Sequence, residues 1–372
     1  MSTPISPSKF EFMLLALRLA RRGYGKTSPN PMVGAVLVKQ GKIIGRGWHQ
    51  GAGKPHAEVE ALRDALKHGH NPRGATLYVT LEPCCTHGRT PPCTDAIIEA
   101  GLRRVVIGAT DPNPQHRGRA FAILNQARLA ITHGVLADEC ARLNEAFNHW
   151  IVHRTPFVTV KAAMTLDGKI ATASGESKWI TGPQARAYGM KLRQGADAIL
   201  VGINTILADD PSLTVRPAQK HRVRRIVLDS KARIPLSAKV LNDAQAPLTT
   251  IVVTRASRKS RLSASSKRVN VLVAPAKSGK IDLRWLVRKL GSENVTSLLV
   301  EGGGQVNASF LFQGLAHRVV FFYAPKILGG VDSRLGVAGA GARRLADAIN
   351  LRNPEWRKLG PDLLFTAQVA DS

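Results

Sequence analysis

The chain has 372 residues and a formal net charge of +27, and its length suggests two domains rather than one core. Hydrophobic residues make up 44% and charged residues 21%, a composition that describes a soluble globular protein. No uninterrupted apolar stretch approaches membrane-spanning length, and four cysteines are poor material for a disulfide framework. The short apolar stretch at 12–17 is followed by arginines rather than preceded by them, so no export signal is predicted and a cytoplasmic location is expected.

The positive charge is spread along the chain, with denser patches at 220–225 and 255–268. Such charge can attract nucleic acid, but only 5% of the residues are aromatic and neither patch is interleaved with them. We therefore interpret both patches as solvated surface and expect no nucleic-acid partner. The charge is also suited to a small phosphorylated substrate, although it identifies none.

Alternating helices and strands are predicted in the first part of the chain. A helix is expected over 10–22, a β-hairpin at 33–38 and 42–47, and a helix over 56–68 with Val59, Leu62 and Leu66 facing inward. A strand at 75–81, a helix from Cys93 to 101 and a strand at 104–108 follow. This order predicts a three-layer α/β/α domain over residues 1–150.

A second α/β domain is predicted over residues 151–372. Its expected strands lie at 157–163, 197–202, 225–229, 248–254 and 297–301, and the last leads through Gly302 to Gly304 into a helix over 305–313. A strand, glycines and a helix can bring backbone amides to a phosphate, but an ordinary tight turn explains the glycines equally well. No G-x-G-x-x-G follows the first strand, so a standard Rossmann half is not expected.

One group of residues points directly to chemistry. His56 and Cys93 each fall in the first turn of a predicted helix, and Cys84 follows a predicted strand. One imidazole and two thiolates can hold a zinc ion and leave its fourth position open for water. Glu58 is placed to move protons, so the set is suited to hydrolytic deamination of an amino-substituted base ring. We interpret Cys85 as a bystander and Cys140 as a small buried residue.

Several motifs resemble a known family, the bifunctional riboflavin-biosynthesis deaminase/reductases. The deaminase half is matched by Asn-Pro-Met-Val-Gly at 30–34, His-Ala-Glu at 56–58, the run 82–93 and Asp-Pro-Asn-Pro at 111–114. The reductase half is matched at 161–168, 174–181, 207–214 and 301–303. The resemblance implies a cytidine-deaminase-like N-terminal domain and a C-terminal domain similar in fold to dihydrofolate reductase.

The reaction implied by the resemblance has two steps. The first domain would hydrolyse the 2-amino group of a diaminopyrimidinone ribosylamine 5'-phosphate, and the second would use NADPH to reduce the ribosyl group to ribityl. His56, Cys84 and Cys93 would hold one zinc ion, with Glu58 as the catalytic proton shuttle. A homo-oligomer is expected.

The family pattern also assigns binding residues. Those around the deaminase substrate would be Asn30, His49 and Arg89. Those around the reductase substrate would be Lys161, Ser177, Arg193, Asp209, Leu213, Arg216 and Glu301, with Arg193 and Arg216 as a phosphate clamp. Those around NADPH would be Ala163, Trp179, Thr205, Asp209, Ser230, Gly303, Gly304, Gln305, Val306, Asn307, Ala308 and Ser309.

The chain departs from the family at one position. Many members carry Cys-Ser-His after the Glu-Pro, with the histidine available to the substrate, whereas this chain has Thr86 followed by His87. Either His87 makes that contact or Thr86 serves with its hydroxyl.

Two other functions share the zinc ligands. A nucleic-acid deaminase of the tRNA-adenosine or cytidine type would use the same chemistry, but it leaves the second half of the chain unexplained. A nucleic-acid-binding scaffold with a structural zinc would need a fourth protein ligand, which His87 or Cys85 would have to supply.

Overall fold

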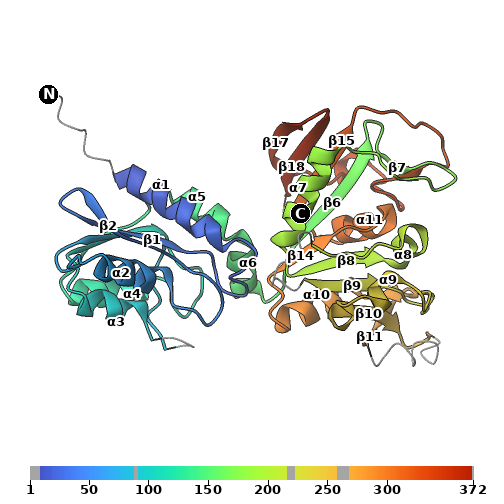
Figure 1. Ribbon diagram of the computed structural model, residues 1–372. Coiled ribbons are helices and arrows are strands. Elements are labelled where there is room, and N and C mark those ends of the chain that lie inside the picture. The colour runs from blue at the N-terminus through green and yellow to red at the C-terminus, as the bar shows by residue number, and fades with distance from the viewer. Residues whose placement is uncertain (1–8, 88–90, 216–222, 258–267, 371–372) are drawn as a thin grey trace. The chain divides into compact units, whose positions relative to one another are not determined.

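The structure is a computed structural model that describes residues 9–87, 91–215, 223–257 and 268–370 (Figure 1). The chain divides into two compact units, one ending at Arg154 and the other beginning at Thr155. In the described residues no helix has the length and apolar character needed to cross a membrane.

The N-terminal unit is built on a five-stranded sheet with the order β2-β1-β3-β4-β5. β1 runs antiparallel to both of its neighbours, while β3, β4 and β5 are parallel. The strands are β1 (Gly34–Lys39), β2 (Lys42–Trp48), β3 (Thr76–Leu81), β4 (Arg104–Ala109) and β5 (Ala130–Thr132).

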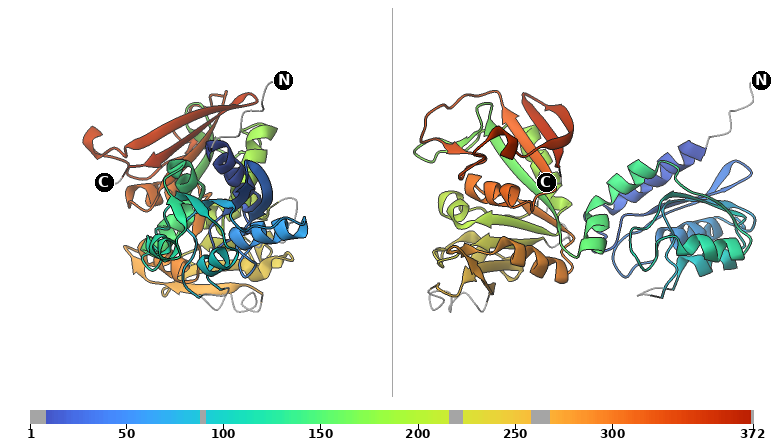
Figure 2. Two further views of the ribbon diagram at one scale, coloured as in Figure 1. Left: turned by 90° about the vertical axis from the view of Figure 1, so that its left-hand side faces the viewer. Right: turned by 180° about the vertical axis from the view of Figure 1, so that it is seen from behind.

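Helices cover both faces of this sheet, which confirms the predicted three layers (Figures 1 and 2). Because side chains alternate along a strand, Val36 and Val38 of β1 pack with one helical layer, and Ala35 and Leu37 pack with the other. The first layer holds α1 (Lys9–Ala20) and α5 (Ala137–Leu143); the second holds α2 (Ala57–Lys67), α3 (Cys93–Glu99) and α4 (Arg119–Gln126). The short helix η1 (Arg21–Gly23) follows α1, and α6 (Glu145–His153) ends the unit.

Helix α2 contacts the sheet through only part of the set that we predicted: Leu62 is buried in the core as expected. Leu66 is 62% exposed, so its inward assignment was wrong, whereas Ala57, Ala61 and Ala65 are buried. These alanines recur every four residues and form a flat stripe. The stripe lies on the glycines of β2, because a Cβ at Gly47 would overlap the Ala57 carbonyl oxygen. Small residues on both elements therefore set the short distance between α2 and β2.

The C-terminal unit contains a nine-stranded sheet with the order β11-β10-β9-β8-β14-β6-β15-β18-β17. The strands from β11 to β15 are parallel, and the hairpin of β17 and β18 adds two antiparallel strands. The bounds are β6 (Phe157–Thr165), β8 (Ala198–Gly202), β9 (Arg224–Leu228), β10 (Thr249–Thr254), β11 (Asn270–Ala274), β14 (Ser297–Val300), β15 (Arg318–Ala324), β17 (Leu351–Leu359) and β18 (Asp362–Val369).

Helices pack on both faces of this sheet as well. One core cluster joins α10 (Leu283–Ser292) and α11 (Gly304–Phe312) to one face, and a second joins α8 (Ile203–Asp209) and α9 (Lys239–Asn242) to the other. A third, smaller cluster joins α7 (Pro183–Gln194) to β15 and β18. The remaining elements are two short ribbons and two helical turns: β7 (Lys169–Ala171) with β16 (Arg334–Leu335), β12 (Ala276–Lys277) with β13 (Lys280–Ile281), η2 (Ala246–Leu248) and η4 (Leu345–Asp347).

The close packing of α2 predicts a sensitive position at Gly47. We expect Gly47→Ala to destabilise the N-terminal unit by about 1–3 kcal/mol, because the added methyl group pushes α2 away from β2. Urea unfolding monitored by circular dichroism measures this. Lys42→Ala, at an exposed position of β2, is the control. An unfolding midpoint equal to that of the control would show that α2 does not depend on this contact.

Candidate active sites

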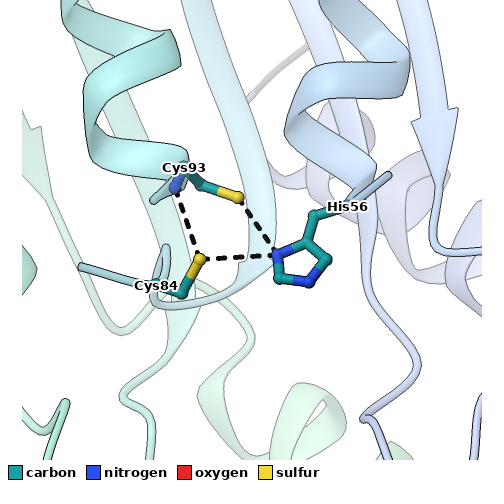
Figure 3. Close-up of side chains that lie close together, drawn as sticks. All are labelled: His56, Cys84 and Cys93. Atoms are coloured by element: carbon teal, nitrogen blue, oxygen red, sulfur yellow. Dashed lines mark hydrogen bonds between the residues drawn. The ribbon is translucent and has the colours of Figure 1, made fainter. Parts of the chain in front are cut away.

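Three side chains from separate segments of the N-terminal unit converge on one point (Figure 3). His56 is the residue before α2, Cys84 follows β3, and Cys93 is the first residue of α3. The Nδ1 atom of His56 lies 3.2 Å from Cys93 Sγ and 3.4 Å from Cys84 Sγ. The three ligand atoms all lie within 4.8 Å of one another.

This geometry fits a tetrahedral zinc ion. With Zn–N near 2.0 Å and Zn–S near 2.3 Å, a tetrahedral site places N and S about 3.5 Å apart. Hydrogen bonds from Cys93 lower the pKa of the Cys84 thiol to about 4, while the neighbouring Cys84 sulfur raises the pKa of Cys93. Two sulfurs this close resist carrying two negative charges, and a divalent cation would offset that repulsion.

The metal group has three members among the described residues, and neither Cys85 nor His87 belongs to it. A structural zinc in a nucleic-acid-binding scaffold would have needed one of these two as a fourth ligand. The observed set instead matches a centre with one position left for water.

Glu58 lies in the first turn of α2 and is 3% exposed. Burial raises the pKa of its carboxyl to about 7, although the charge of His56 acts in the opposite direction. A carboxyl with this pKa can accept and release a proton near neutral pH. The residue therefore has the burial and the acidity that a proton shuttle needs.

Two of the three predicted deaminase substrate residues lie together beside His56. His49 Nδ1 lies 3.1 Å from the Pro55 carbonyl oxygen, so this nitrogen carries the proton and Nε2 accepts from the Asn30 amide at 3.1 Å. The His49 ring meets the His56 ring edge to face, and burial lowers the pKa of His49. A neutral imidazole with a defined tautomer results. The third residue, Arg89, lies outside the described residues.

Two residues to which the sequence analysis gave no role hold these loops in place. Asn144 accepts from the Met32 amide and donates to the Met32 carbonyl, both at 2.8 Å, and so fastens the loop that carries Asn30. Glu82 accepts backbone N–H groups of Asp111, Gly118 and Ala120. Glu82 lies within a recognised motif, but no sequence signal joins Asn144 to Met32 across 112 residues.

In the C-terminal unit several predicted residues follow the carboxyl ends of parallel strands. Thr205 lies in α8 after β8, Ser230 follows β9, Glu301 follows β14, and Gly303 precedes α11. Ligands of open α/β sheets bind beyond this edge of the sheet. The topology therefore brings these positions to one edge, and Ala163 and Lys161 lie on the neighbouring strand β6.

Side-chain contacts connect two pairs within the predicted reductase set. Arg193 forms a two-fold ion pair with Glu301, with N–O distances of 2.9 and 2.6 Å, and its third nitrogen donates to the Thr214 carbonyl. Ser177 donates to the Asp209 carboxylate at 3.1 Å. These contacts use three of the five N–H groups of Arg193, so a phosphate contact at this residue does not require breaking its pair with Glu301.

The Arg193–Glu301 pair is buried, and its electrostatics are strong. Burial opposes ionisation of Glu301, but Arg193 and Lys161 outweigh it and lower the pKa of this carboxyl to about 2. Burial likewise acts to lower the pKa of Arg193, and Glu301 reverses the direction. The pair is charged throughout the ordinary pH range.

The helical geometry of α11 limits how the run 303–309 can contact a cofactor. Successive residues of a helix point about 100° apart, so these side chains cannot all face one ligand. Asn307 and Ala308 are buried, whereas Gln305 is exposed. The backbone amides at the start of α11, after Gly303, are the better candidates.

Three other predicted reductase positions have distinct environments. Leu213 is buried in the core, which leaves its backbone for a ligand contact. Trp179 is 65% exposed, with the Arg186 guanidinium 4.6 Å from its ring centroid. Arg216 lies outside the described residues.

Comparison with known proteins agrees with this geometry in both units. Residues 7–109 match the cytidine and deoxycytidylate deaminase zinc-binding region, and residues 156–365 match the RibD C-terminal domain. The riboflavin biosynthesis protein RibD of Aquifex aeolicus is 46% identical over 95% of this chain and 96% of its own length. The chain belongs to the RibD family.

Solved structures of the RibD family share the fold over nearly the whole chain. Acinetobacter baumannii RibD superposes with a TM-score of 0.85 at 34% identity, covering 97% of this chain and 99% of that one. A diaminohydroxyphosphoribosylaminopyrimidine deaminase/5-amino-6-(5-phosphoribosylamino)uracil reductase from Thermotoga maritima gives 0.81 at 35% identity, with coverages of 97% and 98%.

The family membership establishes a bifunctional deaminase/reductase of riboflavin biosynthesis. Its N-terminal unit is the zinc-binding deaminase domain, and its C-terminal unit is the RibD reductase domain, which has a fold like that of dihydrofolate reductase. A reductase domain implies a nicotinamide cofactor. A nucleic-acid deaminase does not account for the C-terminal match.

The buried Arg193–Glu301 pair predicts a large loss of stability on neutralising one partner. We expect Glu301→Gln to destabilise the C-terminal unit by about 3–5 kcal/mol, because Arg193 would stay buried without its counterion. Urea unfolding of the full chain, monitored by circular dichroism so that a direct effect on catalysis does not enter, measures this. The exposed Glu355→Gln in β17 is the matched control.

The pH dependence of the pair has a definite sign. The pKa of Glu301 is about 2 in the folded protein, below its usual 4.5, so its stabilisation is present above 4.5 and is lost as the pH falls toward 2. Equal midpoints for Glu301→Gln and Glu355→Gln at neutral pH would contradict this account.

Proposed function

We propose that the N-terminal unit hydrolyses the 2-amino group of a diaminopyrimidinone ribosylamine 5'-phosphate and releases ammonia. The C-terminal unit then reduces the ribosyl group of the product to ribityl, with NADPH as the hydride donor. One observation carries the proposal: a three-ligand metal group beside a buried carboxyl is joined in one chain to a RibD reductase domain. The T. maritima relative, 35% identical, bears a name that combines the same two activities.

The deamination step assigns roles to four residues of the N-terminal unit. His56 Nδ1 and the sulfurs of Cys84 and Cys93 would hold zinc, which when bound lowers the pKa of a water ligand toward neutrality. Glu58 accepts the proton of the attacking water and delivers it to the departing amine. Water oxygen is added to the ring carbon, the carbon–nitrogen bond breaks, and the nitrogen leaves as ammonia.

The neighbouring residues would orient the pyrimidine. Asn30 lies next to His49, whose ring meets that of the zinc ligand His56, and the neutral His49 accepts from the Asn30 amide and so fixes the direction in which Asn30 can bond to the ring. The double hydrogen bond between Asn144 and Met32 holds this loop against the domain. Arg89 stays a predicted contact to the phosphate or sugar.

The reductase step requires that NADPH and the sugar lie together. The start of α11 would receive the cofactor: a Cβ at Gly303 would meet open space, whereas one at Gly304 would overlap the Leu335 carbonyl. The buried Asn307 Oδ1 has no partner among the described residues. Trp179, Thr205, Ser230 and Ala163 stay predicted cofactor contacts.

The substrate side of the reductase would use the connected polar residues. Arg193 fixes the Glu301 carboxylate, and Lys161 is the second cation that acts on it. Ser177 and Asp209 form the other hydrogen-bonded pair, so Asp209 can contribute to both ligand sites. NADPH, when bound, would supply hydride to C1 of the ring-opened sugar while the atom double-bonded to C1 takes up a proton, and these groups would orient the sugar and stabilise its charge. The homo-oligomer and the cytoplasmic location stay predictions.

The role of Glu58 predicts a clean separation of metal binding from turnover. We expect Glu58→Gln to keep zinc, whereas its rate of ammonia release should fall by about 10²–10⁴-fold, because an amide cannot accept and release the proton. Zinc content and ammonia release are measured on one preparation. Glu60→Gln, an adjacent acid at the start of α2, is the control. Retained turnover in the zinc-loaded Glu58→Gln variant would refute the assignment.

Metal removal provides a test that separates the two activities. We expect chelation of zinc to abolish ammonia release, while NADPH oxidation with the deaminated intermediate continues, because the zinc ligands all lie in the N-terminal unit. Both rates are followed in the full chain before and after zinc is restored. Loss of both activities on chelation would contradict the independence of the two sites.

A further inference from the structure

A loop after β4 is fastened to the segment that carries the zinc ligand Cys84. Glu82 is the first residue after β3, two residues before Cys84, and its side chain is buried. Its carboxylate accepts the N–H groups of Asp111 at 3.1 Å, Gly118 at 3.1 Å and Ala120 at 3.2 Å. Three hydrogen bonds to one charged acceptor hold the loop in a defined position.

This loop presents an imidazole to the segment after Cys84. Asp111 is buried, and its Oδ2 lies 3.2 Å from Nδ1 of His116, whose side chain is 17% exposed. On the other side of the ring, Nε2 lies 2.8 Å from the hydroxyl of Thr86. The three side chains form one hydrogen-bonded chain from a buried carboxylate to a hydroxyl two residues from a zinc ligand.

The Thr86 hydroxyl can form a further hydrogen bond beyond the one with His116. Because a carboxylate only accepts, Nδ1 of His116 donates to Asp111, and Nε2 bonds to Thr86 Oγ1. A hydroxyl group offers one donor and two acceptor positions. Among the described residues, His116 is the hydrogen-bond partner of this hydroxyl. The imidazole therefore sets the direction of a hydroxyl that can still bond to a ligand.

We propose that His116 is a positioning residue of the deaminase site, which with Asp111 orients the Thr86 hydroxyl toward the ribosyl 5'-phosphate arm of the substrate. The inference rests on the proposed function. It also decides between the two residues that the sequence analysis left open, in favour of Thr86. The imidazole that many relatives carry at this position comes here from another segment.

Charge supports an anionic partner at this place. The amino group to be hydrolysed must lie at the zinc ligands and Glu58, so the phosphate arm must lie farther out. Two arginines, Arg117 and Arg119, are exposed on the loop after β4. The charge of Arg119 acts on Cys85, next to Thr86. A phosphate beside Thr86 would therefore meet the positive charge of this loop.

The test compares variants of the zinc-loaded full chain on the phosphorylated substrate and on its dephosphorylated analogue. We expect His116→Ala and Thr86→Val each to raise KM for the phosphorylated substrate about tenfold, with kcat changed less than about threefold. The KM of the double variant should exceed the higher of the two single-variant KM values by no more than about twofold, because both changes disrupt the same hydrogen-bonded pair. Thr86→Ser should stay within about twofold of the wild type.

Several outcomes would overturn the inference. They are an unchanged KM in His116→Ala, equal losses on the phosphorylated and dephosphorylated compounds, or effects of the two single variants that multiply in the double variant. The NADPH-dependent rate and the zinc content report folding in each sample. If Thr86→Val loses zinc, His116→Ala alone decides, because His116 is distant from the ligands in sequence. Wild-type protein that released no ammonia would refute the proposed function instead.

Discussion

The deaminase site depends on the contact between α2 and β2. Ala57 and Ala61 of the helix lie on Gly45 and Gly47 of the strand, with no room for a further methyl group. This contact places the start of α2 next to the segment after β3 and the start of α3, so one imidazole and two sulfurs meet. The same contact turns Glu58 inward. The positions of the metal group and of the Glu58 carboxyl thus depend on one packing distance, which small residues determine.

Three buried glutamates show how the surroundings of a carboxyl decide its chemistry. Burial raises the pKa of Glu58 to about 7, which suits a group that exchanges protons. Burial also raises the pKa of Glu82, but this carboxylate accepts three backbone N–H groups. It therefore holds a loop in place. Glu301 faces Arg193 and Lys161, which lower its pKa to about 2 and keep it charged. Identical side chains therefore differ in acidity because their surroundings differ.

The two units use similar architecture for different chemistry. Each has a sheet with helices on both faces, and in each the predicted residues cluster where strands end and helices begin. Helix starts in the first unit present a metal ligand, at His56 and Cys93. In the second unit, α11 begins directly after Gly303, and the first backbone amides of a helix have no partner within the helix. The lack of a Rossmann fingerprint agrees with a fold like that of dihydrofolate reductase.

The sequence by itself predicted the three-residue metal group, the hairpin and most of the strands, and the proton-shuttle role of Glu58 stays a prediction. These features follow from local periodicity and from motifs of short spacing, such as His-Ala-Glu at 56–58. Tertiary structure alone decided the exposure of Leu66, the pairing of Arg193 with Glu301, and the contacts of Thr86 and Asn144. Each of these features depends on how whole helices and strands pack together. A single sequence has no local pattern that reports contacts between residues so far apart in the chain.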